Sequence, residues 1–187
     1  DWISKDGSWL NPNIDEYFGS YVEYMMKKLP KKIKFYNTIN EPGIFAFFGY
    51  FSTTKFPPGI ADEKKFIIAS ENIMKAHVTA LKTIKGINPD AMVGMTHALQ
   101  EWEDHDTNKL KEYLKYHLED KFLKASKEDD FIGLQTYTIV RYPRSILLKL
   151  VNPLLLNIPM IRRFLLPRII QIFAGRNGAI SKNTRTT

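Results

Sequence analysis

Three segments with helical periodicity alternate with three short apolar segments along residues 1–140, and this alternation constrains the fold more than any other feature. The helical segments, in which apolar residues recur three or four positions apart, are residues 14–29, 63–86 and 107–125. The apolar segments, which have the length of buried strands, are residues 33–39, 91–96 and 131–138. Because a helix separates each strand from the next, the strands are expected to pair in parallel. The sequence therefore predicts an α/β fold.

Two architectures have this alternation, the closed eightfold barrel and the open, doubly wound sheet. No glycine-rich phosphate-binding motif follows any of the predicted strands, which disfavours a nucleotide-binding sheet. Polar residues instead stand at the carboxyl end of every strand: Asn40 and Glu41, then Thr96 and His97, then Gln135 and Tyr137. Barrel enzymes build their active sites at this end of the strands. We therefore expect part of a (β/α)8 barrel.

Two connections at these strand ends are predicted to be long loops. Residues 43–62 are rich in Gly, Pro and aromatic residues, and residues 97–106 are largely polar. Loops of this length inside a compact domain usually carry function. The histidines at the two ends of the second loop, His97 and His105, could touch a leaving group, but exposure to solvent is the favoured interpretation.

The two remaining histidines are predicted to have structural positions. His77 lies in a helical segment, and His117 lies in another, on the side that faces the core or its edge. The scattered spacing of the histidines does not predict a metal site. With no cysteine in the chain, disulfides, thiolate metal sites and cysteine nucleophiles are excluded, and no cofactor is expected.

The segment Thr38-Ile39-Asn40-Glu41-Pro42 is the candidate for chemistry. A carboxylic acid at the end of a barrel strand can protonate a departing glycosidic oxygen when an apolar pocket and a second carboxylate raise its pKa. Asn40 is suited to hydrogen bonding a sugar hydroxyl, and Pro42 is expected to hold Glu41 in extended geometry. A simple strand-ending turn is an equally good interpretation of these residues taken alone.

The wider sequence resembles family 1 glycoside hydrolases over about residues 1–140, in matching order and spacing. The segments that carry the resemblance are Trp9-Leu10-Asn11-Pro12, Tyr36 to Pro42, Gly49-Tyr50, Pro57-Pro58-Gly59, Asn72 with Ala76-His77, and Asp130-Phe131-Ile132-Gly133. Other retaining barrel families share only the Asn-Glu-Pro element, so the longer series is the more specific signal. The resemblance implies a β-glycosidase acting on β-glucosides or β-galactosides.

The resemblance also implies roles for individual residues. Glu41 would be the catalytic acid/base at the end of the fourth barrel strand, and Asn40 would bind the hydroxyl at sugar carbon 2. Tyr137 would match the last Tyr of the family's Asn-Tyr-Tyr element on strand six, which hydrogen-bonds the nucleophile. That element is Gln135-Thr136-Tyr137 here, so Gln135 and Thr136 change what lines the pocket.

The family's retaining mechanism needs a second carboxylate, a nucleophile roughly 5–5.5 Å from the acid/base. In the family the nucleophile belongs to a Thr-Glu-Asn-Gly-like segment at strand seven, and this chain has no Glu after Glu128. The chain is therefore interpreted as an internal fragment, strands four to six, with residues 177–187 leading toward strand seven. We expect the isolated chain to be inactive. The alternative is a non-catalytic membrane-surface or interaction module derived from the same barrel.

The charge of the chain is divided unevenly along its length. All 20 acidic residues lie in residues 1–130, whereas residues 131–187 hold nine Lys and Arg and no acid. Within this basic part, residues 141–176 form a predicted apolar insert on the active face, and residues 144–175 contain too many prolines and basic residues for a membrane-spanning helix. An anionic membrane surface or a lipid-like aglycone could bind there, or the insert could pack on the barrel.

The same insert bears on partners and location. It carries Leu and Ile where base-stacking aromatic residues would be expected, so nucleic acid is not a predicted partner. The chain is expected to be cytoplasmic, with a possible peripheral position at the inner membrane surface.

Overall fold

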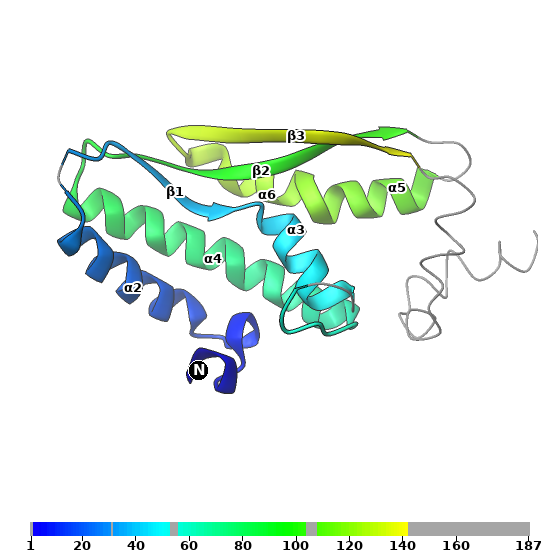
Figure 1. Cartoon of the computed structure of the whole chain (residues 1–187), viewed down its shortest axis with the longest axis horizontal. Helices are drawn as coiled ribbons and strands as arrows, with labels where there is room; N and C mark the ends of the chain where they lie inside the picture. The colour runs from blue at the N-terminus through cyan, green and yellow to red at the C-terminus, as the bar shows by residue number, and fades with distance from the viewer. Residues whose placement is uncertain (1, 31, 53–55, 104–107, 142–187) are drawn as a thin grey trace, which may run out of the picture. The chain divides into compact units, whose positions relative to one another are not determined.

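Three strands form a sheet in the order β1-β2-β3, and their arrows point the same way (Figure 1). The strands are β1 (Phe35–Asn40), β2 (Met92–Glu103) and β3 (Phe131–Arg141). β1 and β2 pair in parallel, with Phe35 opposite Met92. The structure is a computed structural model that describes residues 2–30, 32–52, 56–103 and 108–141. The predicted parallel α/β arrangement is confirmed for the residues described.

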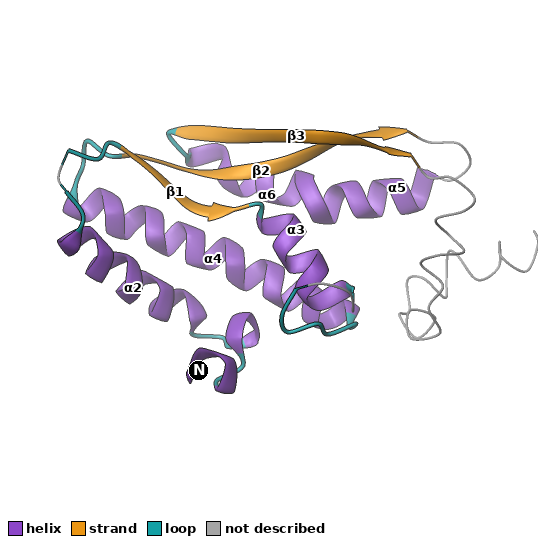
Figure 2. Cartoon of the chain, viewed as in Figure 1, coloured by secondary structure: helices purple, strands orange, loops and turns teal. Residues whose placement is uncertain are grey.

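The helices gather on one face of this sheet (Figure 2). The two long ones, α2 (Ile14–Lys28) and α4 (Glu63–Ile87), pack against each other, and α4 also packs against β1 and β2. The shorter segments are α1 (Trp2–Lys5), the 3-10 turn η1 (Ser8–Leu10), α3 (Pro42–Ala46), the π-helical turn η2 (Phe47–Phe51), α5 (Asn108–Lys115), the π-helical turn η3 (Tyr116–Asp120), α6 (Lys121–Ala125) and the 3-10 turn η4 (Ser126–Glu128).

The bounds of α2 and α4 agree closely with the prediction because both helices have clear end signals. α2 has two acids in its first turn and two lysines in its last, which the helix dipole favours. α4 begins after Asp62, whose side chain accepts a hydrogen bond from the Lys65 amide at 3.1 Å. Between these helices and the sheet lies a core formed by Val22, Ala80, Ile84, Ala91 and Val93, with Phe18, Met26, Tyr36 and Leu81 packed around it.

The predicted loop over residues 43–62 is wrong in its first part, because the chain is helical from Pro42 to Phe51. Proline is favourable in the first turn of a helix, where no amide hydrogen is needed. The rings of Phe47 and Phe51 stack with centroids 5.1 Å apart, and both lie against Phe66 of α4. This aromatic packing makes a helix stable in a segment whose glycine and aromatic content indicated a loop.

The predicted polar loop over residues 97–106 is also wrong, because β2 continues to Glu103. Near its end, β2 is also bound by a buried carboxylate from the helical segment that follows it. Oε1 of Glu119 accepts hydrogen bonds from the Gln100 amide and from Nε1 of Trp102, both at 2.8 Å. This partner lies far along the sequence, so the local polarity could not reveal it.

The face of the sheet without helices, termed the open face below, is bridged by side chains of the two outer strands. The rings of Phe35 on β1 and Phe131 on β3 are in contact, with centroids 5.9 Å apart. They meet across Gly94 of the middle strand, where a Cβ would stand 2.1 Å from the carbonyl oxygen of Phe131. Outer strands that meet over a middle strand are expected on the inner face of a barrel.

Several predictions concern residues outside the described part of the chain. The insert over residues 141–176, apart from the end of β3, and the lead-in over residues 177–187 fall there, and so does His105. Within the described residues, no helix has the length and apolar character needed to cross a membrane.

Candidate active site

Glu41 stands where β1 ends and α3 begins, at the carboxyl end of the sheet. Its amide donates to the carbonyl oxygen of Thr96 at 2.7 Å, and its own carbonyl accepts from the Phe45 amide at 3.0 Å. The first bond ties the residue to β2 and the second ties it to the helix. The residue is half-buried, so part of its surface is open to solvent.

The expected extended backbone at Glu41 is wrong. Glu41 has φ 47° and ψ 56°, the left-handed region that residues other than glycine rarely adopt. Pro42 does exclude the right-handed helical conformation from the residue before it, but the chain must turn from strand into helix within a single residue. The left-handed conformation makes this turn possible, at a cost of about 1–3 kcal/mol that the two backbone hydrogen bonds help to offset.

A bulge in β1 directly precedes this turn. Asn37 lies opposite Gly94 and Asn40 lies opposite Thr96, so three steps along β1 correspond to two steps along β2. One residue of β1 is therefore extra. Bulges of this kind bend the strand and change the direction of the side chains that follow.

Two of the predicted substrate-binding residues are in contact. Nε2 of Gln135 on β3 donates to Oδ1 of Asn40 at 2.6 Å, a bond that spans the full width of the three strands. Asn40 is exposed and Gln135 is half-buried. The third residue, Tyr137, lies in β3, but its side chain is outside the part of the structure that is described.

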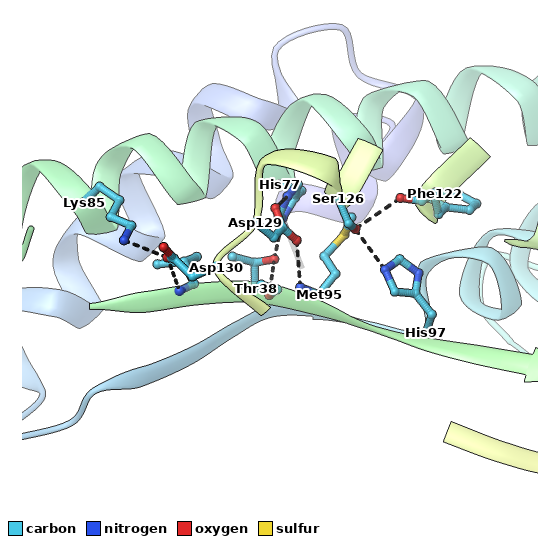
Figure 3. Close-up of polar contacts among 11 residues, drawn as sticks. Thr38, His77, Lys85, Met95, His97, Phe122, Ser126, Asp129 and Asp130 are labelled. Atoms are coloured by element: carbon cyan, nitrogen blue, oxygen red, sulfur yellow. Dashed lines mark hydrogen bonds and ion pairs between the residues drawn. The ribbon is translucent and has the colours of Figure 1, made fainter. Parts of the chain in front are cut away.

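On the helix-covered face, a buried polar chain lies behind β1 (Figure 3). Nδ1 of His77 is 2.7 Å from Oγ1 of Thr38, and Nε2 of His77 is 2.9 Å from Oδ1 of Asp129. The other oxygen of Asp129 accepts from the Met95 amide at 3.1 Å. The side chains of His77 and Asp129 are each 1% exposed. His77 is thus structural, as predicted.

Both ring nitrogens of His77 take part in this chain, and the Thr38 hydroxyl also donates to the carbonyl oxygen of Gly94 at 3.3 Å. Burial raises the pKa of Asp129, and the neighbouring His77 opposes that rise. His77 and Asp129 thus form a buried, hydrogen-bonded pair.

His97 is not exposed, contrary to the expectation for it. It lies within β2, 2% exposed, with Nε2 2.9 Å from Oγ of Ser126 (Figure 3). Burial, with a smaller effect from the charge of His77, lowers the pKa of His97 to about 4. The ring is therefore neutral at pH 7, and it supports the sheet from the covered face.

Glu119 is a buried acid without a distinct sequence signal, because it occupies an ordinary position in a predicted helix. Burial raises the pKa of its carboxyl group, and the hydrogen bonds from Gln100 and Trp102 act in the opposite direction. Trp102 lies on the part of β2 that extends beyond the carboxyl end of β1, so Glu119 holds an indole ring near the same edge as Glu41.

His117 faces aromatic side chains, as its predicted orientation toward the core requires. Its ring lies near Phe66, Tyr113 and Tyr116, and burial lowers its pKa to about 4. Among the described residues, no three His, Cys, Asp or Glu side chains are grouped so that they could hold a metal ion.

Parallel strands covered by helices on one face, with polar side chains following a strand's carboxyl end, are the arrangement on which barrel enzymes build their active sites. The model of glycosyl hydrolase family 1 matches residues 2–133, which is more than half of the chain. The chain belongs to this family.

Relatives and solved structures agree with this assignment. A 6-phospho-beta-galactosidase of Staphylococcus epidermidis is 34% identical over 119 residues, which is 63% of this chain and 25% of that protein. A 6-phospho-beta-galactosidase of Staphylococcus aureus is 38% identical over 98 residues, which is 52% of this chain and 20% of the relative. These curated relatives are thus matched over no more than a quarter of their length.

Two solved structures have the same fold. A beta-glycosidase from Pyrococcus horikoshii superposes with a TM-score of 0.66 at 24% identity, over 82% of this chain and 38% of its own. The family 1 b-glucosidase from Thermotoga maritima gives 0.64 at 18% identity, over 76% and 40%. This likeness concerns the fold and agrees with a partial (β/α)8 barrel.

Proposed function

We propose that this chain is the acid/base-bearing part of a longer retaining β-glycosidase and supplies strands four to six of its barrel. The observation that carries the proposal is the position of Glu41, a half-buried acid at the carboxyl end of a parallel strand, next to Asn40, which Gln135 contacts. In this role Glu41 protonates the departing glycosidic oxygen and then takes a proton from the attacking water.

The neighbouring residues fit the binding of a sugar. Because Gln135 already donates to Oδ1 of Asn40, Asn40 would meet a sugar hydroxyl through its NH2 group. Tyr137, two residues after Gln135 on β3, would contact the nucleophile. The nucleophile itself would come from a segment that this sequence does not contain, since no acidic residue follows Asp130.

The substrate proposed is a terminal β-glucoside or β-galactoside. The curated relatives are 6-phospho-beta-galactosidases, so a β-galactoside phosphorylated at carbon 6 is the first candidate to test. Aryl β-glucosides, β-galactosides and their 6-phosphates therefore form the substrate panel.

The test is Glu41→Gln in the full-length protein of which this chain is proposed to be a part. Removing a general acid is expected to lower kcat/KM about 10²–10⁴-fold for a phenyl glycoside, whose leaving group needs a proton. For a 2,4-dinitrophenyl glycoside the first step should be nearly unaffected, and added azide should restore turnover by replacing the activated water. Full activity of Glu41→Gln toward the phenyl glycoside would refute the proposal.

The 187-residue chain alone is expected to be inactive, because a retaining reaction needs both carboxylates. Purified chain, confirmed as folded by circular dichroism, should release no phenol from any glycoside in the panel. Turnover by this chain that disappears in Glu41→Gln would show that the nucleophile is present after all.

A further inference from the structure

We propose that Thr38, His77 and Asp129 are positioning residues that decide where the Glu41 carboxyl group stands. The inference rests on the proposed function of Glu41 as acid/base. All three side chains belong to the helix-covered side of the sheet, and they act on Glu41 through the backbone of β1 (Figure 3).

Thr38 lies in the bulge of β1. The extra residue lies between Asn37 and Asn40, so Thr38 is within the irregular part of the pairing. A bulged residue is not held by the regular ladder of the sheet. Thr38 is held by its side chain instead, through Oγ1, which bonds to Gly94 on β2 at 3.3 Å and to His77 on α4 at 2.7 Å.

His77 and Asp129, which hold the Thr38 hydroxyl, are themselves fixed by several elements. His77 lies on α4, and Asp129 lies in the segment that enters β3, while its second oxygen is bonded to the amide of Met95 on β2. The His77–Asp129 pair thus links the Thr38 hydroxyl on β1 to α4, to β2 and to the segment that enters β3. Because neither side chain is exposed, water cannot replace these bonds when the structure moves.

The bulge sets the face of the sheet on which Asn40 and Glu41 lie. Side chains alternate between the two faces of a strand, so losing the extra residue would move everything after it to the opposite face. Asn40 follows the bulge directly, and Glu41 makes the next contact with β2, at Thr96. The bulge therefore decides whether Asn40 and Glu41 meet substrate or the helices.

The experiment compares two glycosides of one sugar in the full-length protein, with phenol and with 2,4-dinitrophenol as leaving groups. Only the first needs a proton from Glu41. A variant that merely folds poorly lowers kcat/KM for both substrates by one common factor. A misplaced acid lowers the value for the phenyl glycoside selectively, so the ratio of the two kcat/KM values reports position and not the amount of folded enzyme.

Thr38→Val removes the hydroxyl and keeps the shape, and it should lower the phenyl to dinitrophenyl ratio about 10- to 100-fold. Thr38→Ser keeps the hydroxyl and should hold the ratio within about twofold of the starting enzyme. Asp130→Asn is the matched control. Asp130 is adjacent to Asp129, binds the Val93 amide and Lys85, and has no bond to β1, so its ratio should not change.

The possible failures are distinguishable. If Glu41→Gln lowers the ratio and Thr38→Val does not, the positioning role is wrong and the proposed function stands. If Glu41→Gln leaves the ratio unchanged, the proposed function is wrong and this inference fails with it. Should Thr38→Val not fold, Asp129→Asn has the same shape as Asp129 without its charge, and an unchanged ratio in that variant would overturn the role.

Discussion

On the helix-covered face of the sheet, His77 and Asp129 are 1% exposed and each of their ring nitrogens and carboxylate oxygens has a partner. On the open face, Asn40 is exposed, Glu41 is half-buried, and the amide contact between Asn40 and Gln135 joins two outer strands. β1 contributes to both faces within four residues. The polar groups are thus divided between the two faces: buried ones fix the backbone, and exposed ones remain available for chemistry.

The sharpest test of this division is to remove one buried partner. Asp129→Ala leaves Nε2 of His77 and the Met95 amide buried without their partner, which should lower the free energy of unfolding by about 3–5 kcal/mol for the two groups together. Urea unfolding of the 187-residue chain at pH 7, monitored by circular dichroism, measures it. Asp130→Ala removes the neighbouring carboxylate, whose partner Lys85 is partly exposed, and should cost much less. Equal losses in the two variants would break the comparison.

β2 and β3 come very close to each other at Gly94, and a second substitution tests this contact. Gly94→Ala places a Cβ 2.1 Å from the carbonyl oxygen of Phe131, and backbone cannot move aside as a flexible side chain can. The expected loss is near 3 kcal/mol, the upper end of typical overpacking costs. Gly86→Ala in α4 meets no atom within 4 Å and should stabilise by about 0.5–1 kcal/mol. A neutral Gly94→Ala would show that the strands do not meet there.

The dependence of stability on pH tests the covered face again. The pKa of His97 is about 4 in the folded chain and about 6.5 when unfolded, so its contribution is complete above pH 6.5 and is lost as the pH falls toward 4. The free energy of unfolding should therefore fall between pH 7 and pH 5, with about 2 kcal/mol of that fall due to His97.

His97→Gln isolates this contribution, because a glutamine amide can replace Nε2 in the bond to Ser126 and does not titrate. Urea unfolding at pH 7 and pH 5 gives the difference for each protein. The variant should lose less stability than the original chain over this range. An identical fall in both would mean that His97 is accessible to protons in the folded state.

The sequence predicted those parts of the fold whose signals are local. Apolar residues recur regularly through α2 and α4, and helix-ending residues follow them. Both ends of each helix therefore agree with the prediction to within one residue. The position of Asn40 and Glu41 at the end of a strand was likewise visible, whereas Gln135, expected at the carboxyl end of its strand, lies in the middle of β3 because that strand continues to Arg141.

The remainder depends on contacts between distant residues. The part of β2 beyond Thr96 is bound by Glu119, and the buried His97 contacts Ser126. Thr38, within the bulge, contacts a histidine 39 residues further along the chain. No pattern within one segment indicates such partners. The left-handed backbone at Glu41 has no local signal either, since it follows from β1 ending and α3 beginning within a single residue.

The smallest expected effect on stability belongs to the amide pair at the site itself. Asn40→Ala and Gln135→Ala each remove a bond between largely exposed groups, where water replaces the lost partner, so each should lower the free energy of unfolding by less than about 1 kcal/mol. The coupling between them, from a double-mutant cycle in urea, should be about 0.5 kcal/mol.

The cycle formed by Thr38→Val and His77→Gln provides the contrast, because its hydrogen bond is buried and joins a helix to a strand. Its coupling should be at least twice that of the Asn40 and Gln135 pair. A larger coupling on the open face would reverse the division proposed above, and the exposed amides would then be part of the framework. With the expected order, Asn40 and Gln135 can change for substrate binding with little effect on the fold, whereas the residues behind β1 cannot.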